Sequence, residues 1–236
     1  MGEKEQKELD IIKNKEFIEK YPFLKPTNVW TGEPIKDYDY SYTYLDDMPK
    51  GWKKAFGVSF CEDLMAAMKK SPKYEEILKK YRILQVKEKF GELRWYDNGH
   101  TKEMGQVIYI YEHISTRTCI TCGKINVPIY DDGWICPECD ECFEERTKKR
   151  MEYLKKNFAT KMESSKKNET MEDIKQRFKV DDGPFTRDIH LISYVKGEKK
   201  DIYIDCSETL KKIGYNPEQL PYFKDIKKEK ENLEDE

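Results

Sequence analysis

The sequence predicts an α+β protein: helices and short β-hairpins around an embedded four-cysteine ribbon, followed by a small C-terminal α+β module. Three observations support this class. Apolar residues recur with the helical period across residues 52–70. Alternating residues bounded by turn-forming glycine predict hairpins near 82–96 and 189–205. Two pairs of cysteines, each spaced C-x2-C, lie thirteen residues apart between residues 119 and 139.

Residues 1–50 are expected to form an N-terminal helix and an extended aromatic arm. The helix covers 3–21 and ends at Pro22. Tyrosines at 38, 40, 42 and 44 alternate with polar residues, a pattern typical of a strand. We favour tyrosines that cover the core over a surface that stacks on bases or on a partner.

Residues 51–117 are expected to form the α+β core. The helix over 52–70 ends before Ser71 and Pro72, and a second helix follows through Tyr81. The hairpin over 82–96 turns at Gly91. Residues 102–117 return to helical spacing, although their β-branched content leaves a strand open.

The cysteine spacing predicts one tetrahedral zinc site. Cys119 and Cys122 form the first pair, and Cys136 and Cys139 form the second. Four thiolates saturate a zinc ion and leave no position for a substrate, so the site is structural. Two disulfides, a single iron or a redox pair are the alternatives. Cys142 extends the second pair to C-x2-C-x2-C and could replace Cys139 as a ligand, but we interpret it as a small buried residue or a spare thiol.

The remaining boundaries follow from composition. The predicted zinc ribbon covers 118–143, with a hairpin turning at 131–133, and Trp134 and Ile135 lying against the metal. A charged helix over 144–163 and a polar linker over 164–170 follow. The C-terminal module covers 171–223, with a hairpin and a helix near 207–213, and residues 224–236 are expected to be a disordered tail.

Overall composition narrows the location and the partners. The 236 residues have a net charge of -2, which gives no global attraction to nucleic acid. No apolar run reaches membrane-spanning length, and no leader opens the chain. Seven cysteines, an odd number, indicate a reducing cytosol. We therefore expect a cytoplasmic protein that makes no contact with membranes.

The hairpin over 82–96 is the candidate nucleic-acid interface. It carries Lys87, Lys89 and Arg94 next to Trp95, and basic groups beside aromatic rings can follow a phosphate backbone and stack on bases. Glu88 and Glu92 are interleaved with these cations. An ordinary ribbon with a solvated charged face is the interpretation we favour.

No pattern of catalytic residues stands out. The histidines at 100, 113 and 190 are in no recognisable arrangement with a nucleophile, although His113 could replace a cysteine ligand or support one. Asp201 and Asp205 share one face of a predicted strand and leave a metal-dependent nuclease as a weak alternative. No phosphate-binding glycine loop is present, and no small-molecule substrate is evident.

Residues 50–143 resemble a group of uncharacterised bacteriophage and prophage proteins. The likeness rests on the segments 51–57 (GWKKAFG), 88–99 (EKFGELRWYDNG), 117–123 (RTCITCG) and 133–139 (GWICPEC). The resemblance implies a bacterial host cytoplasm and an accessory role. We therefore expect a non-enzymatic zinc protein that binds and modulates a host protein, including a host-defence protein. A nucleic-acid-binding zinc-ribbon protein is the alternative.

Overall fold

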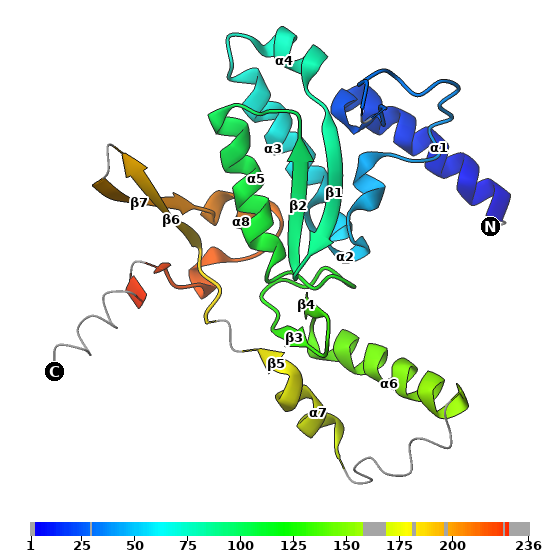
Figure 1. The fold of residues 1–236 in the computed structure, drawn as a ribbon, viewed down its shortest axis with the longest axis vertical. Helices are drawn as coiled ribbons and strands as arrows, with labels where there is room; N and C mark the ends of the chain where they lie inside the picture. The colour runs from blue at the N-terminus through cyan, green and yellow to red at the C-terminus, as the bar shows by residue number, and fades with distance from the viewer. Residues whose placement is uncertain are drawn as a thin grey trace.

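The computed structural model describes residues 3–28, 30–157, 169–180, 183–195, 198–223 and 225–226. The predicted α+β class is confirmed: helices surround three small antiparallel sheets, and a four-cysteine cluster lies beside β3, β4 and α6. Figure 1 shows a central body, with α6 and α7 below it and the β6–β7 hairpin at one side. The helices are α1 (Glu3–Lys20), α2 (Lys50–Trp52), α3 (Val58–Lys69), α4 (Tyr74–Lys80), α5 (Lys102–Ser115), α6 (Asp140–Asn157), α7 (Met171–Phe178) and α8 (Ser207–Lys212).

The strands form three separate sheets. β1 (Ile83–Lys89) pairs with β2 (Glu92–Asp97), and β6 (Asp188–Val195) pairs with β7 (Glu198–Asp205). The third sheet has the order β4 (Ile135–Pro137), β3 (Ile129–Asp131), β5 (Lys179–Val180). It therefore joins the cysteine-rich segment to residues some fifty positions later in the chain.

The core lies between the α2–α3 helix and α5 on one side and the β1–β2 hairpin on the other. A π-helical turn (Lys53–Gly57) joins α2 to α3, so residues 50–69 form one helical run. Phe60 stacks on Tyr111 of α5 with ring centroids 4.6 Å apart, and it packs at the same distance against Trp95 of β2. The predicted helical face is buried, and each large apolar side chain contributes roughly 1.5–3 kcal/mol. Its members are Trp52, Phe56, Phe60, Leu64, Ala67 and Met68.

The sequence over 102–117 folds as helix α5 and not as a strand. Thr101 caps it, because its side chain accepts a hydrogen bond from the Met104 N–H at 3.3 Å. Met104, Ile108 and Tyr111 are buried at helical spacing against α3. Packing of this apolar face outweighs the low helix propensity of β-branched residues.

The alternating tyrosines of residues 38–44 do not form a strand, contrary to the prediction. Asp37 and Tyr40 have positive φ angles, which extended strands exclude. Thr43 and Asp46 form a capping box that starts a 3-10 turn (Tyr44–Asp47). Tyr44 is buried and Tyr38 packs on the core, so the tyrosines cover the core as we favoured, but through local turns.

The C-terminal residues pack against the same core as the N-terminal ones. Phe185, Cys206, Leu210 and Leu220 belong to one cluster with the side chains of α3 and α5. The predicted hairpin is confirmed as β6–β7, with a closing pair Val195 and Glu198 that makes its turn shorter than expected. Among the described residues, no helix is both long and apolar enough to cross a membrane.

Candidate metal centre

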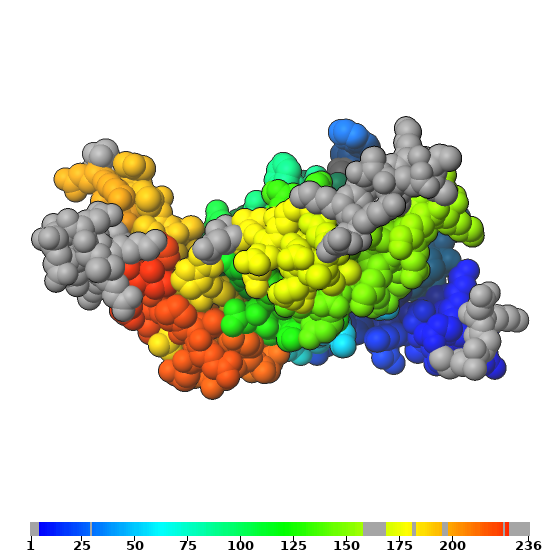
Figure 2. All heavy atoms as spheres, turned by 90° about the horizontal axis from the view of Figure 1, so that it is seen from below, coloured from blue at the N-terminus to red at the C-terminus, as the bar shows by residue number. Residues whose placement is uncertain are grey.

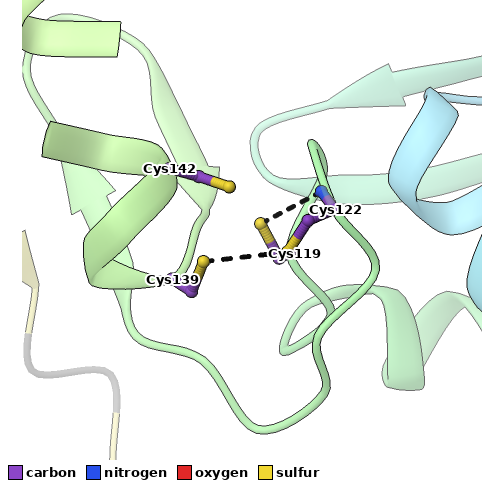
Figure 3. A group of neighbouring side chains, drawn as sticks. All are labelled: Cys119, Cys122, Cys139 and Cys142. Atoms are coloured by element: carbon purple, nitrogen blue, oxygen red, sulfur yellow. Dashed lines mark hydrogen bonds between the residues drawn. The ribbon is translucent and has the colours of Figure 1, made fainter. Parts of the chain in front are cut away.

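Four cysteines come together where the chain passes from α5 into α6. The sulfur atoms of Cys119, Cys122, Cys139 and Cys142 all lie within 4.8 Å of one another. Figure 3 shows Cys119 and Cys122 on one loop, facing Cys139 and Cys142 on the other side of the cluster. The Cys122 and Cys139 sulfurs are 3.7 Å apart. Zn–S bonds of about 2.3 Å in a tetrahedron place sulfurs about 3.8 Å apart, so the cluster is consistent with a zinc-binding site.

The first pair lies on a tight knuckle. The Cys119 N–H donates to the Lys124 carbonyl at 2.7 Å, and the Gly123 N–H donates to the Cys119 carbonyl at 3.0 Å. Gly123 has a φ of 87°, a conformation that favours glycine, as its place after the second cysteine predicts. The Cys122 N–H points at the Cys119 sulfur at 3.5 Å, which orients that sulfur toward the cluster.

The second pair lies at the start of α6. The Phe143 N–H donates to the Cys139 carbonyl at 3.0 Å, so Cys139 immediately precedes the helix and Cys142 lies in its first turn. Residues three apart share one helical face, which brings both sulfurs to the same side. The partial positive charge at a helix N-terminus favours thiolates there.

Cys136 does not belong to this cluster. Cys142 takes the place that the cysteine spacing had given to Cys136. Cys136 lies in β4 opposite Tyr130, and it is fully buried in the main hydrophobic core. The spacing alone predicts that Cys136 and Cys139 form the second pair of ligands. Pro137 instead ends β4, and α6 begins at Asp140, earlier than the expected Glu144.

The thiols differ in their tendency to ionise. Burial raises the pKa of Cys142 to about 12 and raises the pKa values of Cys139 and Cys136 above the usual range. Burial also opposes ionisation of Cys122, yet the Lys124 backbone N–H and the neighbouring thiols together lower its pKa. A divalent cation would convert such thiols into thiolates, so metal binding at this site releases protons.

The cluster is attached to the helical core through α2. The Gly51 N–H donates to the Ile120 carbonyl at 2.9 Å, and the Trp52 indole N–H donates to the Thr118 carbonyl at 2.7 Å. A Cβ atom on Gly51 would lie 2.2 Å from the Cys119 carbonyl oxygen. Only glycine therefore allows this approach of the helix to the knuckle.

A buried ionic network joins the hairpin to α6. Glu138 is almost fully buried and receives hydrogen bonds from Arg146 at 2.8 Å and from the Thr121 hydroxyl at 3.0 Å. Arg146 also contacts Asp132 at 2.8 Å. With four sulfurs close enough to surround one ion, the cysteine cluster has the character of a structural metal site.

The four candidate nucleic-acid-binding residues differ in exposure and in their partners. Trp95 is only 5% exposed, and its indole N–H donates to the Tyr81 hydroxyl at 2.9 Å, so it is not available to stack on bases. Arg94 forms an ion pair with Glu92 at 2.6 Å. Lys87 and Lys89 lie over the rings of Tyr96 and Phe90.

Two exposed aromatic side chains lie at neighbouring hairpin tips. Phe90 at the tip of β1–β2 is 71% exposed, and Trp134 at the tip of β3–β4 is 44% exposed. The Trp134 indole N–H donates to Glu88 at 3.3 Å, and a Cβ on Gly91 would contact Ile135, so the tips pack together. Trp134 was expected against the metal but instead lies over Arg146. We call Phe90 and Trp134 the aromatic tip surface.

The other polar candidates have structural partners. His113 is outside the metal cluster; its ring packs on Phe185 and its Nε2 lies 3.1 Å from the Thr186 carbonyl. Asp201 contacts His190 at 2.5 Å, whereas Asp205 accepts the Ser207 N–H at 2.7 Å. Within the described part of the chain, the four cysteines are the only group of metal-ligating side chains.

Comparison with known proteins adds no assignment. Searches against protein-family models, curated proteins and solved structures find no match to this chain.

Proposed function

We propose that this chain is a non-enzymatic phage accessory protein that binds and modulates a host protein in the bacterial cytoplasm, with zinc as a structural ion. The ligands are Cys119, Cys122, Cys139 and Cys142. Four sulfur ligands complete the tetrahedron that zinc prefers, which favours a structural role over a catalytic one. A host-defence protein is one class of target.

The aromatic tip surface is the observation that carries the protein-binding proposal. Aromatic side chains are enriched at the centres of protein interfaces, where they bury large areas at low entropic cost. Two nearby cations are neutralised, because Arg94 pairs with Glu92 and Arg146 pairs with Glu138 and Asp132, while Lys89 lies over the ring of Phe90. Such a surface suits a protein partner better than a polyanion.

The test is affinity capture of the full chain from nuclease-treated bacterial lysate, with variants in parallel. We expect a host protein that the wild type retains and that the double variant Phe90→Ala, Trp134→Ala loses. The matched control is Tyr109→Ala, Tyr153→Ala, which removes two exposed aromatic rings from α5 and α6. Equal capture by all three proteins would disprove a role for the aromatic tip surface.

Nucleic-acid binding remains the second candidate, because Lys87 and Lys89 lie beside the exposed rings of Tyr96 and Phe90. This function predicts binding to single-stranded DNA or RNA that weakens steeply with salt and is reduced in Lys87→Ala, Lys89→Ala. Flat titrations at low salt would eliminate it.

A further inference from the structure

A buried carboxylate joins the metal cluster to helix α6. Glu138 directly precedes the ligand Cys139 and is only 1% exposed. Its two carboxylate oxygens have different partners: the hydroxyl of Thr121, inside the first cysteine pair, donates to one at 3.0 Å, and Arg146 Nε donates to the other at 2.8 Å. A buried carboxylate is costly unless it is paired and hydrogen-bonded, so the knuckle and Arg146 are held by the same group.

Arg146 extends this connection to the tip of the β3–β4 hairpin. Its Nη1 donates to Asp132 at 2.8 Å, and its guanidinium lies over the Trp134 ring, 5.7 Å from the centroid. One guanidinium therefore contacts both the carboxylate beside the metal ligands and the aromatic ring at the tip. The rigid fork of donors in arginine holds two carboxylates in a fixed geometry.

Glu88 holds Trp134 from the opposite hairpin. One of its carboxylate oxygens accepts the Gly91 N–H at 2.6 Å in the β1–β2 turn, and the other accepts the Trp134 indole N–H at 3.3 Å. Phe90 immediately precedes Gly91, so this contact sets Trp134 beside Phe90. The aromatic tip surface is continuous only while Trp134 keeps this orientation.

The position of Arg146 depends on the first turns of α6. Figure 1 shows α6 running from β3 and β4 away from the central body, and Figure 2 shows α7 beside it. Within α6, all of whose residues are described, only Phe143 is buried, and it stacks on Tyr130 with ring centroids 3.9 Å apart. Arg146 follows the ligand Cys142 by four residues, on the same helical face. A zinc ion that joins Cys142 to the knuckle therefore fixes Arg146 relative to the hairpin.

We infer that Arg146 positions Trp134 in response to zinc binding, so that the aromatic tip surface is assembled only in the zinc-bound chain. The role of that surface in binding a host protein rests on the proposed function, whereas the coupling between metal and tip is a property of this chain alone. Coupling between two sites is reciprocal, so a partner bound at the tip raises the affinity for zinc. Zinc thereby controls partner binding as well as stability.

Acrylamide quenching of tryptophan fluorescence measures the exposure of Trp134. A Trp30→Phe background removes the other exposed tryptophan, because Trp52 and Trp95 are buried in the core. We expect removal of zinc with a chelator to raise the quenching of Trp134 about twofold, because its exposed fraction would rise from 44% toward the 94% of Trp30 once Arg146 no longer covers the ring.

Arg146→Gln separates positioning by this side chain from a general effect of zinc on folding. In the zinc-bound variant we expect quenching of Trp134 at the zinc-free value, with one zinc per chain and an unchanged circular dichroism spectrum. Arg150→Gln is the matched control, because Arg150 lies one turn further along α6 and donates to the same Asp132 carboxylate at 2.9 Å. The described residues show no ion pair between Arg150 and Glu138, so this control should quench like the wild type.

A second variant keeps the test decisive if Arg146→Gln fails to fold. Loss of Arg146 leaves the Glu138 carboxylate buried without its cation, and the double variant Arg146→Gln, Glu138→Gln removes that charge. We expect it to bind zinc and to show the same raised quenching. Wild-type quenching in a zinc-bound Arg146 variant, or an equal rise in Arg150→Gln, would overturn the inference.

Affinity capture from nuclease-treated lysate separates this inference from the proposed function. A host protein that the wild type and Arg150→Gln retain and that zinc-bound Arg146→Gln loses would support both. Retention by Arg146→Gln would overturn the inference and leave the proposed function standing. If no host protein is retained by any variant, the proposed function is contradicted, and the quenching of Trp134 still decides whether zinc and Arg146 control the tip.

Discussion

Cys142 and Cys136 exchange the roles that spacing alone assigns to them. A C-x2-C pair at a helix start is geometrically equivalent to a knuckle pair, because in both cases residues three apart face the same side. The choice between Cys136–Cys139 and Cys139–Cys142 therefore depends on where the helix begins. Asp140 begins it, and Cys142 follows in the first turn.

Single substitutions at these cysteines should separate the two roles. We expect Cys142→Ser to weaken zinc binding at least tenfold in a chelator competition, because it removes one ligand. Cys136→Ala should retain one zinc per chain and lose about 1–2 kcal/mol of unfolding free energy, since it leaves a small cavity in the core. Zinc loss in Cys136→Ala with retention in Cys142→Ser would restore the assignment from spacing.

His113 should make the stability of the protein depend on pH. Burial lowers its pKa below the ordinary value, an effect that Arg117 reinforces and that the Thr186 carbonyl and Asp188 oppose. The unfolded chain then binds a proton near pH 6.5 while the folded chain does not. Stability contributed by neutral His113 is therefore present above that pH and is lost as the pH falls toward the folded-state pKa.

The comparison of wild type with His113→Gln isolates this contribution. We expect the urea midpoint of the wild type to fall more between pH 7.5 and pH 5.5 than that of the variant. Both proteins share any acid-induced metal release, so the difference reports His113. Parallel pH profiles would contradict the assignment.

At the scale of elements, the approach of α2 to the cysteine knuckle joins the metal site to the core. We expect Gly51→Ala to lower the unfolding free energy by about 2–3 kcal/mol, because its Cβ would overlap backbone carbonyl oxygens that are fixed by the knuckle. Zinc affinity should fall with it. Chemical denaturation and chelator competition measure the two effects.

Gly57 provides the matched control, because it lies in the same helical run and its added Cβ would meet side-chain atoms no closer than 3.5 Å. Gly57→Ala should be neutral or stabilise by about 0.5–1 kcal/mol. Equal losses at the two positions would indicate that helix packing alone, without the knuckle, decides the result.

At the scale of the whole molecule, the metal site and the hydrophobic core are distinct sources of stability. The cysteines pack with Val127 in a small cluster of their own, whereas the aromatic core of α3, α5 and β2 forms a separate, larger one. A segment that cannot bury a large apolar core depends on metal binding to fold. The knuckle and the start of α6 should therefore respond first to chelation.

Hydrogen exchange with and without EDTA measures this response. We expect residues 118–143 to lose amide protection when zinc is removed, while α3 and α5 keep most of theirs. Uniform loss of protection would show that the chain unfolds as one cooperative unit. No change anywhere would mean that the cluster needs no metal to fold.

Local signals predicted the elements well where the chain's own pattern was strong. The apolar face of residues 52–70, the turn at Gly91 and the first cysteine pair depend on neighbours close in sequence, and all were predicted correctly. The tyrosines at 38–44 were wrong as a strand, because side-chain caps at Thr43 and Asp39 compete with extended backbone. Trp95 was a candidate for stacking on bases but is buried, because strand alternation does not reveal which face of the hairpin packs on the core.

Residue spacing and turn chemistry were enough to predict the α+β class, a four-cysteine metal motif and most hairpins. Which four sulfurs meet, which face of β1–β2 is buried and how the two hairpin tips pack depend on the folded chain. Each of these depends on contacts between segments distant in the chain: Gly51 with Ile120, Phe60 with Trp95, and Glu88 with Trp134. Spacing within one segment carries no information about such contacts.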